Sequence, residues 1–289
     1  MELSTTSERP LSQLRTAIAI LDKVPLLPDS IQRLLEWTSR YYHCPLGEVF
    51  ANALPNSLRV GKDFKNSLKK SPKIHAAKIN SKKIVINTTT DGALAKIIQL
   101  NTHQQQAIAT IINSLGKFQA FLLNGVTGSG KTEVYLEAIQ AVLDRGEQAL
   151  VLVPEIGLTP QMLERFQARF SVPLLLFHSR LTEKQRLEHW LLSKTGAASI
   201  IIGTRSALFT PLLRPGIIIV DEEHDSSFKQ QNGLRYHARD LALVRGRLEN
   251  IPVILGSATA SLESVFNARQ KRYQMLHLPE RAGNALQPS

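Results

Sequence analysis

The chain has 289 residues, 43% of them hydrophobic, and a formal net charge of +11. This length and apolar content predict one full α/β domain with a smaller companion, and no apolar run is long enough to span a membrane, so we expect a cytoplasmic protein. The single cysteine, Cys44, excludes an internal disulfide and a multi-cysteine zinc site, and the charge favours a polyanionic partner such as nucleic acid over a basic surface without a ligand.

The first sixty residues predict helices. Residues 11–23 carry apolar side chains at helical spacing, and residues 29–43 predict a second helix that Asp29 or Ser30 caps. The apolar face of this second helix would consist of Ile31, Leu34, Leu35 and Thr38. Its three aromatic residues, at helical spacing, fit packing better than base stacking: Trp37, Tyr41 and Tyr42.

A basic stretch follows at residues 62–83, where eight lysines face one acid, Asp63. Contact with nucleic-acid phosphates and a merely solvated surface are equally good interpretations of such a run. Residues 82–98, KKIVINTTTDGALAKII, then indicate a short strand, a turn at Asp91-Gly92 and the start of a helix.

From Leu100 onward, short apolar runs alternate with helical patterns, which predicts a parallel sheet with helices on both faces. Ligands of such sheets bind at the carboxyl ends of the strands. The predicted strands are 120–124, 149–153, 174–178, 199–202, 217–221 and 252–256, and examples of the helices between them are 132–145, 159–170 and 182–193. The last helix opens with a capping box, Thr182 and Gln185.

A phosphate-binding loop lies between the first predicted strand and its helix, in the stretch FLLNGVTGSGKTEVYLEAI at 121–139. It matches G-x-x-x-x-G-K-[ST] in the required strand–loop–helix context, so a glycine turn that merely caps a helix is a much weaker interpretation. The glycines let several backbone N–H groups point at one phosphate, and the helix dipole adds to them. The predicted nucleotide-binding residues are Gly125, Val126, Thr127, Gly128, Ser129, Gly130, Lys131 and Thr132.

Acidic residues follow the most apolar strand of the chain in GIIIVDEEHDSSF, residues 216–228. Asp221 beside a phosphate loop can hold Mg²⁺, and Glu222 can orient or deprotonate a water molecule. An acid-rich helix start is the simpler alternative, which the preceding phosphate loop disfavours. Near the last strand, VILGSATAS offers Ser257, Thr259 and Ser261, which either relay the state of the nucleotide or cap the next helix; the residues alone favour capping.

The segments GVTGSGKT, DEEH and GSAT resemble motifs I, II and III of superfamily 2 helicases in order and spacing. More closely, LNTHQQQA, NGVTGSGKTEVYL, LVPEIGLTPQ, FHSRLTEKQRLEHW, IIGTRSALFTPL and VDEEHDSSFKQQNGLRYHARDLA are similar to the family of primosomal replication-restart DNA helicases, primosomal protein N′. The resemblance runs from about Leu11 to the end. It implies the tail of an N-terminal DNA-binding domain at 1–60, a basic linker or degenerate winged-helix region at 61–97, and a RecA-like P-loop NTPase lobe at 98–289.

The resemblance also assigns roles to single residues. ATP and Mg²⁺ would be the cofactors, Gln104 would read adenine, and Thr132 and Asp221 would hold the metal. The catalytic residues would be Lys131, Asp221, Glu222 and His224. The single-strand path would pass Pro154, Glu155, Gly203, Thr204 and Arg205, and coupling of DNA binding to hydrolysis would use Phe228, Arg235, Tyr236, Ser257 and Thr259.

The sequence departs from the family pattern in two ways. Leu234 stands where a tryptophan is expected in the aromatic-rich loop 226–236, and losing a stacking ring removes about 1–3 kcal/mol of base contact, so DNA stimulation should be weak. The family also continues beyond residue 289 into a zinc-binding insertion and a second lobe with an arginine finger. Such a finger contributes about 10³–10⁵ in turnover, so we expect Mg-ATP binding with poor hydrolysis.

The function expected from the resemblance is that of an ATP-dependent DNA helicase that restarts stalled replication forks. Forked or single-stranded DNA, primosome proteins and single-strand-binding protein would be the partners of a monomer. The alternative is a DNA-binding protein that responds to nucleotide without turnover. A small-molecule kinase is a third possibility, which the combination of DEEH and GSAT disfavours.

Overall fold

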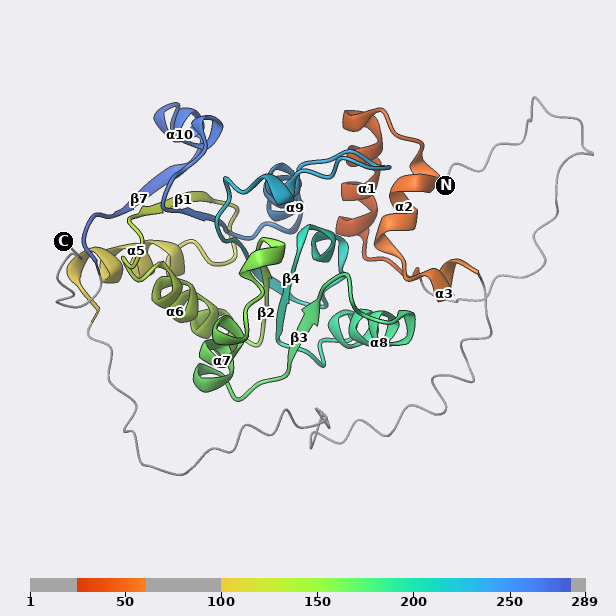
Figure 1. Ribbon diagram of the computed structural model, residues 1–289, viewed down its shortest axis with the longest axis horizontal. Helices are drawn as coiled ribbons and strands as arrows, with labels where there is room; N and C mark the ends of the chain where they lie inside the picture. Colours follow the sequence, from red (N-terminus) through yellow and green to blue (C-terminus); the bar gives the residue numbers. More distant parts are fainter. Residues whose placement is uncertain (1–24, 61–99, 282–289) are drawn as a thin grey trace, which may run out of the picture.

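The computed structural model describes residues 25–60 and 100–281 (Figure 1). The expected helix at 11–23, the basic stretch at 62–83 and the strand and turn expected within 82–98 lie outside the described residues. The helices are α1 (Asp29–Tyr42), α2 (Leu46–Ala53), α3 (Asn56–Arg59), α5 (Thr102–Ile112), α6 (Lys131–Asp144), α7 (Pro160–Arg169), α8 (Glu183–Lys194), α9 (Ala238–Glu249) and α10 (Leu262–Arg269). The 3₁₀ turns are η2 (Glu155–Gly157), η3 (Arg205–Phe209) and η4 (Ser226–Phe228).

In the described part of the chain, the sheet has seven strands in the order β3-β4-β2-β5-β6-β1-β7, and every neighbouring pair is parallel. The strands are β1 (Ala120–Gly125), β2 (Gln148–Leu152), β3 (Leu174–Phe177), β4 (Ile200–Gly203), β5 (Pro215–Val220), β6 (Val253–Ser257) and β7 (Gln274–Leu278). Six of them confirm the predicted strands to within two residues. The seventh, β7, was not predicted, because it is an edge strand in which Gln274 and His277 interrupt the apolar residues and leave no apolar run.

Side chains alternate between the two faces of each strand, and each face has its own core. On β5, Ile217 and Ile219 pack with helices α5, α6 and α7, while Ile218 and Val220 pack on the opposite face, to which α1, α8, α9 and α10 also contribute. The sheet is therefore covered on both sides, as predicted. Within the described residues, no helix combines the length and the apolarity that crossing a membrane requires.

Helix α1 lies on the outer side of α9 and shares its core with the sheet (Figure 1). The four residues of its predicted apolar face are all fully buried. The predicted cap is wrong, because the helix begins at Asp29 with Pro28 as N-cap and without a side-chain cap. Asp29 instead pairs with Arg33 at 2.9 Å, one turn further on. By contrast, the capping box predicted for α8 is present in full.

Candidate nucleotide and DNA site

The phosphate-binding loop lies between β1 and α6, as its sequence predicted. Gly128 and Gly130 have φ values of +79° and +81°, in the left-handed region that glycine adopts without strain. A Cβ on Gly125 would lie 2.4 Å from the Ser129 hydroxyl, so the loop folds back too tightly for any side chain there. Helix α6 begins directly after Gly130, and its first N–H groups and dipole lie at the loop.

Gln104 reaches the loop from α5. Its side-chain amide is buried, with Nε2 donating to the Ser129 carbonyl at 2.9 Å and Oε1 accepting from the backbone N–H of Asn101 at 2.9 Å. Because both ends of the amide are bound to protein, Gln104 fixes the loop to α5 in this structure. The hydroxyl of Ser129 is buried, and no described residue forms a hydrogen bond with it.

Lys131 and the acids of the DEEH segment come together at the carboxyl end of the sheet. The Lys131 ammonium donates to the Gly125 carbonyl at 3.0 Å and lies 4.0 Å from the Glu222 carboxylate. Glu222 has φ +48°, an unusual value for a residue with a Cβ, and such backbone strain costs on the order of 1–3 kcal/mol and concentrates at functional sites. The strained backbone places this partly exposed carboxylate beside the lysine.

Tyr135, one turn after Lys131, holds Asp221 in place, and sequence reasoning missed it. Its hydroxyl donates to Asp221 Oδ1 at 2.9 Å. Burial, then the neighbouring Glu222 charge, raises the pKa of Asp221, while the Tyr135 bond opposes that rise. Burial also raises the pKa of Tyr135, so this side chain stays a proton donor. The contact needs Gly256 on β6, where a Cβ would lie 1.6 Å from the Tyr135 hydroxyl oxygen.

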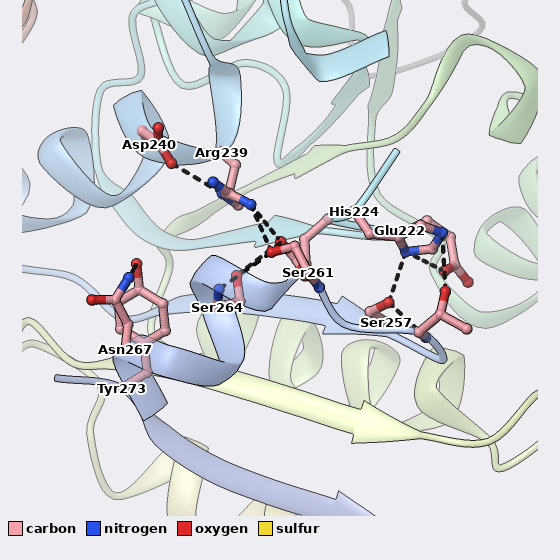
Figure 2. A network of polar contacts seen from close by, with 11 residues as sticks. Glu222, His224, Arg239, Asp240, Ser257, Ser261, Ser264, Asn267 and Tyr273 are labelled. Carbon is pink, nitrogen blue, oxygen red and sulfur yellow. Dashed lines mark hydrogen bonds and ion pairs between the residues drawn. The ribbon is translucent and has the colours of Figure 1, made fainter. Parts of the chain in front are cut away.

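His224 joins the DEEH segment to the end of β6 (Figure 2). Its Nδ1 lies 2.7 Å from the Ser257 hydroxyl and 3.6 Å from Glu222, and its Nε2 lies 3.2 Å from the Thr259 hydroxyl. Ser261 caps α10 by accepting a hydrogen bond from the N–H of Ser264. The capping interpretation is therefore confirmed for Ser261, while a relay of the nucleotide state through Ser257 and Thr259 stays a prediction that their contacts with His224 permit.

Glu223 is fully buried, although its neighbour Glu222 is partly exposed. It accepts hydrogen bonds from the Ser261 N–H at 2.7 Å, the Ser261 hydroxyl at 3.0 Å and the Ser264 hydroxyl at 2.9 Å. It also forms an ion pair of 3.1 Å with Arg239, which is 7% exposed (Figure 2 shows Arg239 with both serines). The sequence analysis assigned no role to Glu223 or Arg239, although both lie within the segment VDEEHDSSFKQQNGLRYHARDLA that resembles the family.

The residues expected along the single-strand path follow β2 and β4. Pro154 and Glu155 begin η2, and the Glu155 carboxylate lies 3.8 Å from Arg205 at the start of η3. Arg205 also donates to the Ser227 carbonyl at 2.6 Å. At Gly203 a Cβ would lie 2.7 Å from the Phe177 carbonyl, so β3 and β4 approach too closely for a side chain. Thr204 is buried there.

The aromatic residues of the loop 226–236 are packed in the core. Phe228 is fully buried, and Tyr236 is 4% exposed, with its ring edge-on to Phe209 at 5.3 Å. Leu234 is buried among the same core residues, and the weak DNA stimulation expected from its place in the loop stays a prediction. Arg235, in contrast, is exposed. Both rings are therefore packed in the core in this conformation, and their expected role in coupling DNA binding to hydrolysis stays a prediction.

The residues present fit a nucleotide with its metal. The loop amides, the helix start and Lys131 form a cradle for phosphate, and the carboxylate of Asp221 and the hydroxyl of Thr132 are the oxygen ligands that Mg²⁺ prefers. The described residues include no group of three or more His, Cys, Asp or Glu side chains that could hold a metal without such a ligand. A cation here would therefore depend on phosphate oxygens and water for the rest of its shell.

Comparison with known proteins agrees with this geometry. Residues 101–268 match the family model "DEAD/DEAH box helicase", and residues 1–55 match "3'DNA-binding domain (3'BD)". The replication restart protein PriA of Haemophilus influenzae is 38% identical over 98% of this chain and 46% of its own length. That of Synechocystis is 51% identical over 63% of this chain and 22% of its own length.

The chain spans less than half the length of these curated relatives. Among solved structures, RecG bound to a three-way DNA junction is similar with a TM-score of 0.47 and 19% identity, over 65% of this chain and 25% of that one. The family model covers more than half of the chain, and its residues include the loop, Lys131 and the DEEH segment. The chain belongs to the DEAD/DEAH box helicase family and, within it, to the PriA replication restart proteins.

Proposed function

We propose that the chain is the first motor lobe of an ATP-dependent DNA helicase that restarts stalled replication forks. The observation that carries this proposal is the convergence of Lys131, Asp221 and Glu222 beside a phosphate-binding loop, at one edge of the sheet. Acidic and basic groups arranged in this way suit phosphoryl transfer from a nucleotide.

Each residue has a separable task in this proposal. The loop amides from Gly128 to Lys131 hold the phosphates, and the Lys131 ammonium balances their charge. Thr132 and Asp221 hold Mg²⁺, which when bound neutralises charge on the phosphate oxygens. The Glu222 carboxylate orients the attacking water and takes its proton. Gln104 is proposed to contact adenine, which requires its bond to the Ser129 carbonyl to open, because both ends of its amide bind protein in this structure.

The same edge of the sheet is proposed to carry DNA. Pro154, Glu155, Gly203, Thr204 and Arg205 follow strand ends near the nucleotide residues, and the name of the model matched at residues 1–55 suggests that the N-terminal part holds a 3′ DNA end. The bond from Arg205 to the Ser227 carbonyl supports a role for the loop 226–236 in coupling. In this proposal Phe228 and Tyr236 act by packing, and the exposed Arg235 contacts DNA. Primosome proteins and single-strand-binding protein are proposed partners.

The test measures the affinity of the purified chain for a fluorescent ATP analogue with Mg²⁺, and its release of phosphate from ATP with and without forked DNA. Lys131→Ala should weaken analogue binding by roughly tenfold to a hundredfold, because a hydrogen bond to a charged group contributes about 1.5–3 kcal/mol. Lys117→Ala is the matched control, since it removes the same charge from an exposed site before β1.

Three outcomes separate the candidates. Phosphate release that DNA stimulates and Lys131→Ala abolishes supports the helicase lobe. Analogue binding that depends on Lys131, without release, supports the second candidate, a DNA-binding protein that responds to nucleotide without turnover. Analogue binding that is absent, or equally weakened by both substitutions, contradicts both candidates.

A further inference from the structure

The buried Glu223 carboxylate joins three elements. Its backbone follows β5, and three of its four hydrogen-bond donors are the N–H and hydroxyl of Ser261 and the hydroxyl of Ser264, at the start of α10. The fourth donor, Arg239, comes from the start of α9. A fully buried carboxylate is stable only while its donors stay in place, so the position of α9 affects the DEEH segment directly.

Helix α9 is tied to α1 at both of its ends. The N–H of His237, the residue before α9, donates to the Tyr42 hydroxyl at the end of α1, at 3.1 Å. The hydroxyl of Ser30 at the start of α1 donates to Glu249 at the end of α9, also at 3.1 Å. The two helices therefore run antiparallel in a fixed register, and between these two contacts they pack along their length. A movement of α1 must be followed by α9.

Arg239 lies two residues after His237 and has its own supports. Its Nε donates to Asp240 at 3.0 Å, and its Nη1 donates to both Glu223 and the Ser261 hydroxyl (Figure 2). Glu223 in turn adjoins Glu222 and His224, which face Lys131 and the end of β6. The contacts thus form a continuous path from the Tyr42 hydroxyl to the nucleotide edge.

We infer that Arg239 is a positioning residue that couples helix α1 to the DEEH segment, so that a DNA 3′ end held by the N-terminal part changes nucleotide affinity. The inference rests on the proposed function, because it needs nucleotide at Lys131 and DNA at residues 1–55. Coupling between two binding sites is reciprocal, so nucleotide must change DNA affinity by the same factor. Couplings of this kind are typically about 5-fold to 150-fold.

The experiment measures the dissociation constant of the whole chain for a non-hydrolysable fluorescent ATP analogue with Mg²⁺, with and without a saturating single-stranded oligonucleotide that has a free 3′ end. The ratio of the two constants is the coupling factor. Tyr42→Phe removes only the hydroxyl that accepts from His237, and Arg239→Lys keeps the charge but loses the fork that reaches three partners. We expect Tyr42→Phe to reduce the coupling factor about threefold or more and to leave affinity without DNA within about twofold.

Tyr41→Phe is the matched control, because it removes a hydroxyl from the adjacent residue of α1, and this hydroxyl has no hydrogen bond to any residue that the structure describes. It should leave the coupling factor unchanged. Arg239→Lys should reduce the factor more than Tyr42→Phe does. Thermal unfolding of each variant establishes that the measured population is folded.

The outcomes separate this inference from the proposed function. If the chain does not bind the analogue, or if Lys131→Ala does not weaken binding, the proposed function fails and this inference fails with it. If the analogue binds through Lys131 but DNA does not change its affinity, the inference alone fails. It fails likewise if coupling exists and neither Tyr42→Phe nor Arg239→Lys reduces it, in which case the contacts only stabilise the fold.

Discussion

Glu222 and Glu223 are adjacent in the chain and chemically identical, yet they occupy opposite environments. Glu222 has a left-handed backbone, a side chain that is 39% exposed, and two distant partners, His224 at 3.6 Å and Lys131 at 4.0 Å. Glu223 is fully buried and accepts four hydrogen bonds, one of them from Arg239. The Glu222 carboxylate is therefore accessible to a ligand, whereas the Glu223 carboxylate has all its contacts within the protein.

The difference follows from the turn that comes directly after β5. Glu222 has a left-handed backbone with φ +48°, and the turn directs its carboxylate to the phosphate loop while Glu223 enters the core between α9 and α10. A buried carboxylate without hydrogen-bond donors would be strongly unfavourable, and here Ser261, Ser264 and Arg239 supply the donors. One short segment therefore carries chemistry on one side and joins helices on the other.

The largest expected effect comes from removing the buried charge. Glu223→Gln should lower the free energy of unfolding by about 3–5 kcal/mol, because it leaves the Arg239 charge without its buried partner. The new side-chain NH₂ group would also face the groups that donate hydrogen bonds to Glu223. Glu222→Gln should change it by about 0.5 kcal/mol or less, as expected for an exposed side chain. Urea unfolding of the two variants measures the contrast. Equal losses of stability in the two variants would contradict the assignment of a structural role to Glu223 and not to Glu222.

The next largest effect concerns the support of Asp221. Gly256→Ala places a Cβ 1.6 Å from the Tyr135 hydroxyl oxygen, so the ring must move and release Asp221. We expect a loss of about 1–3 kcal/mol in stability, together with weaker binding of the Mg²⁺-bound ATP analogue. In a double-mutant cycle, Tyr135→Phe should cost less in the Gly256→Ala background than alone, since the hydroxyl has already lost its partner. If the stability losses of Gly256→Ala and Tyr135→Phe simply add, the close contact between residue 256 and the Tyr135 hydroxyl is contradicted.

Much of this architecture was readable from sequence. The apolar runs predicted six strands, and the glycine spacing placed the phosphate loop between β1 and α6. These signals are local, because periodicity and turn chemistry act within a few residues. Since all strands are parallel, strand-end residues such as Asp221, Ser257 and Gly203 necessarily share one edge with the loop.

The parts that were missed depend on contacts between distant residues. The Tyr135–Asp221 bond spans 86 positions, and nothing in the helical pattern of α6 marks one tyrosine as its donor. Gly256 carried a usable signal, because an isolated glycine inside an apolar strand indicates close approach of another group. The burial of Tyr236 against Phe209 is of the same kind, since the loop sequence alone does not show which distant ring it packs against.

The smallest effect has the opposite sign and concerns Asp221, which combines burial with a functional task. Burial and then the Glu222 charge raise its pKa in the folded protein above the ordinary 3.8. Folding therefore favours the protonated form, and the free energy of unfolding falls as pH rises from 3.8 through the folded pKa. At neutral pH the ionised carboxylate destabilises the fold.

Asp221→Asn removes this charge without changing shape, and the amide oxygen can still accept from Tyr135. The variant should therefore unfold at a higher temperature than the parent chain at pH 7. Below pH 3.8, where both states of the parent chain are protonated, this advantage should disappear. Thermal unfolding at a series of pH values measures the difference. A variant that is less stable at pH 7, or an advantage that does not change with pH, would mean that the Asp221 charge is compensated in the folded chain, in which case Lys131 rather than burial dominates its environment.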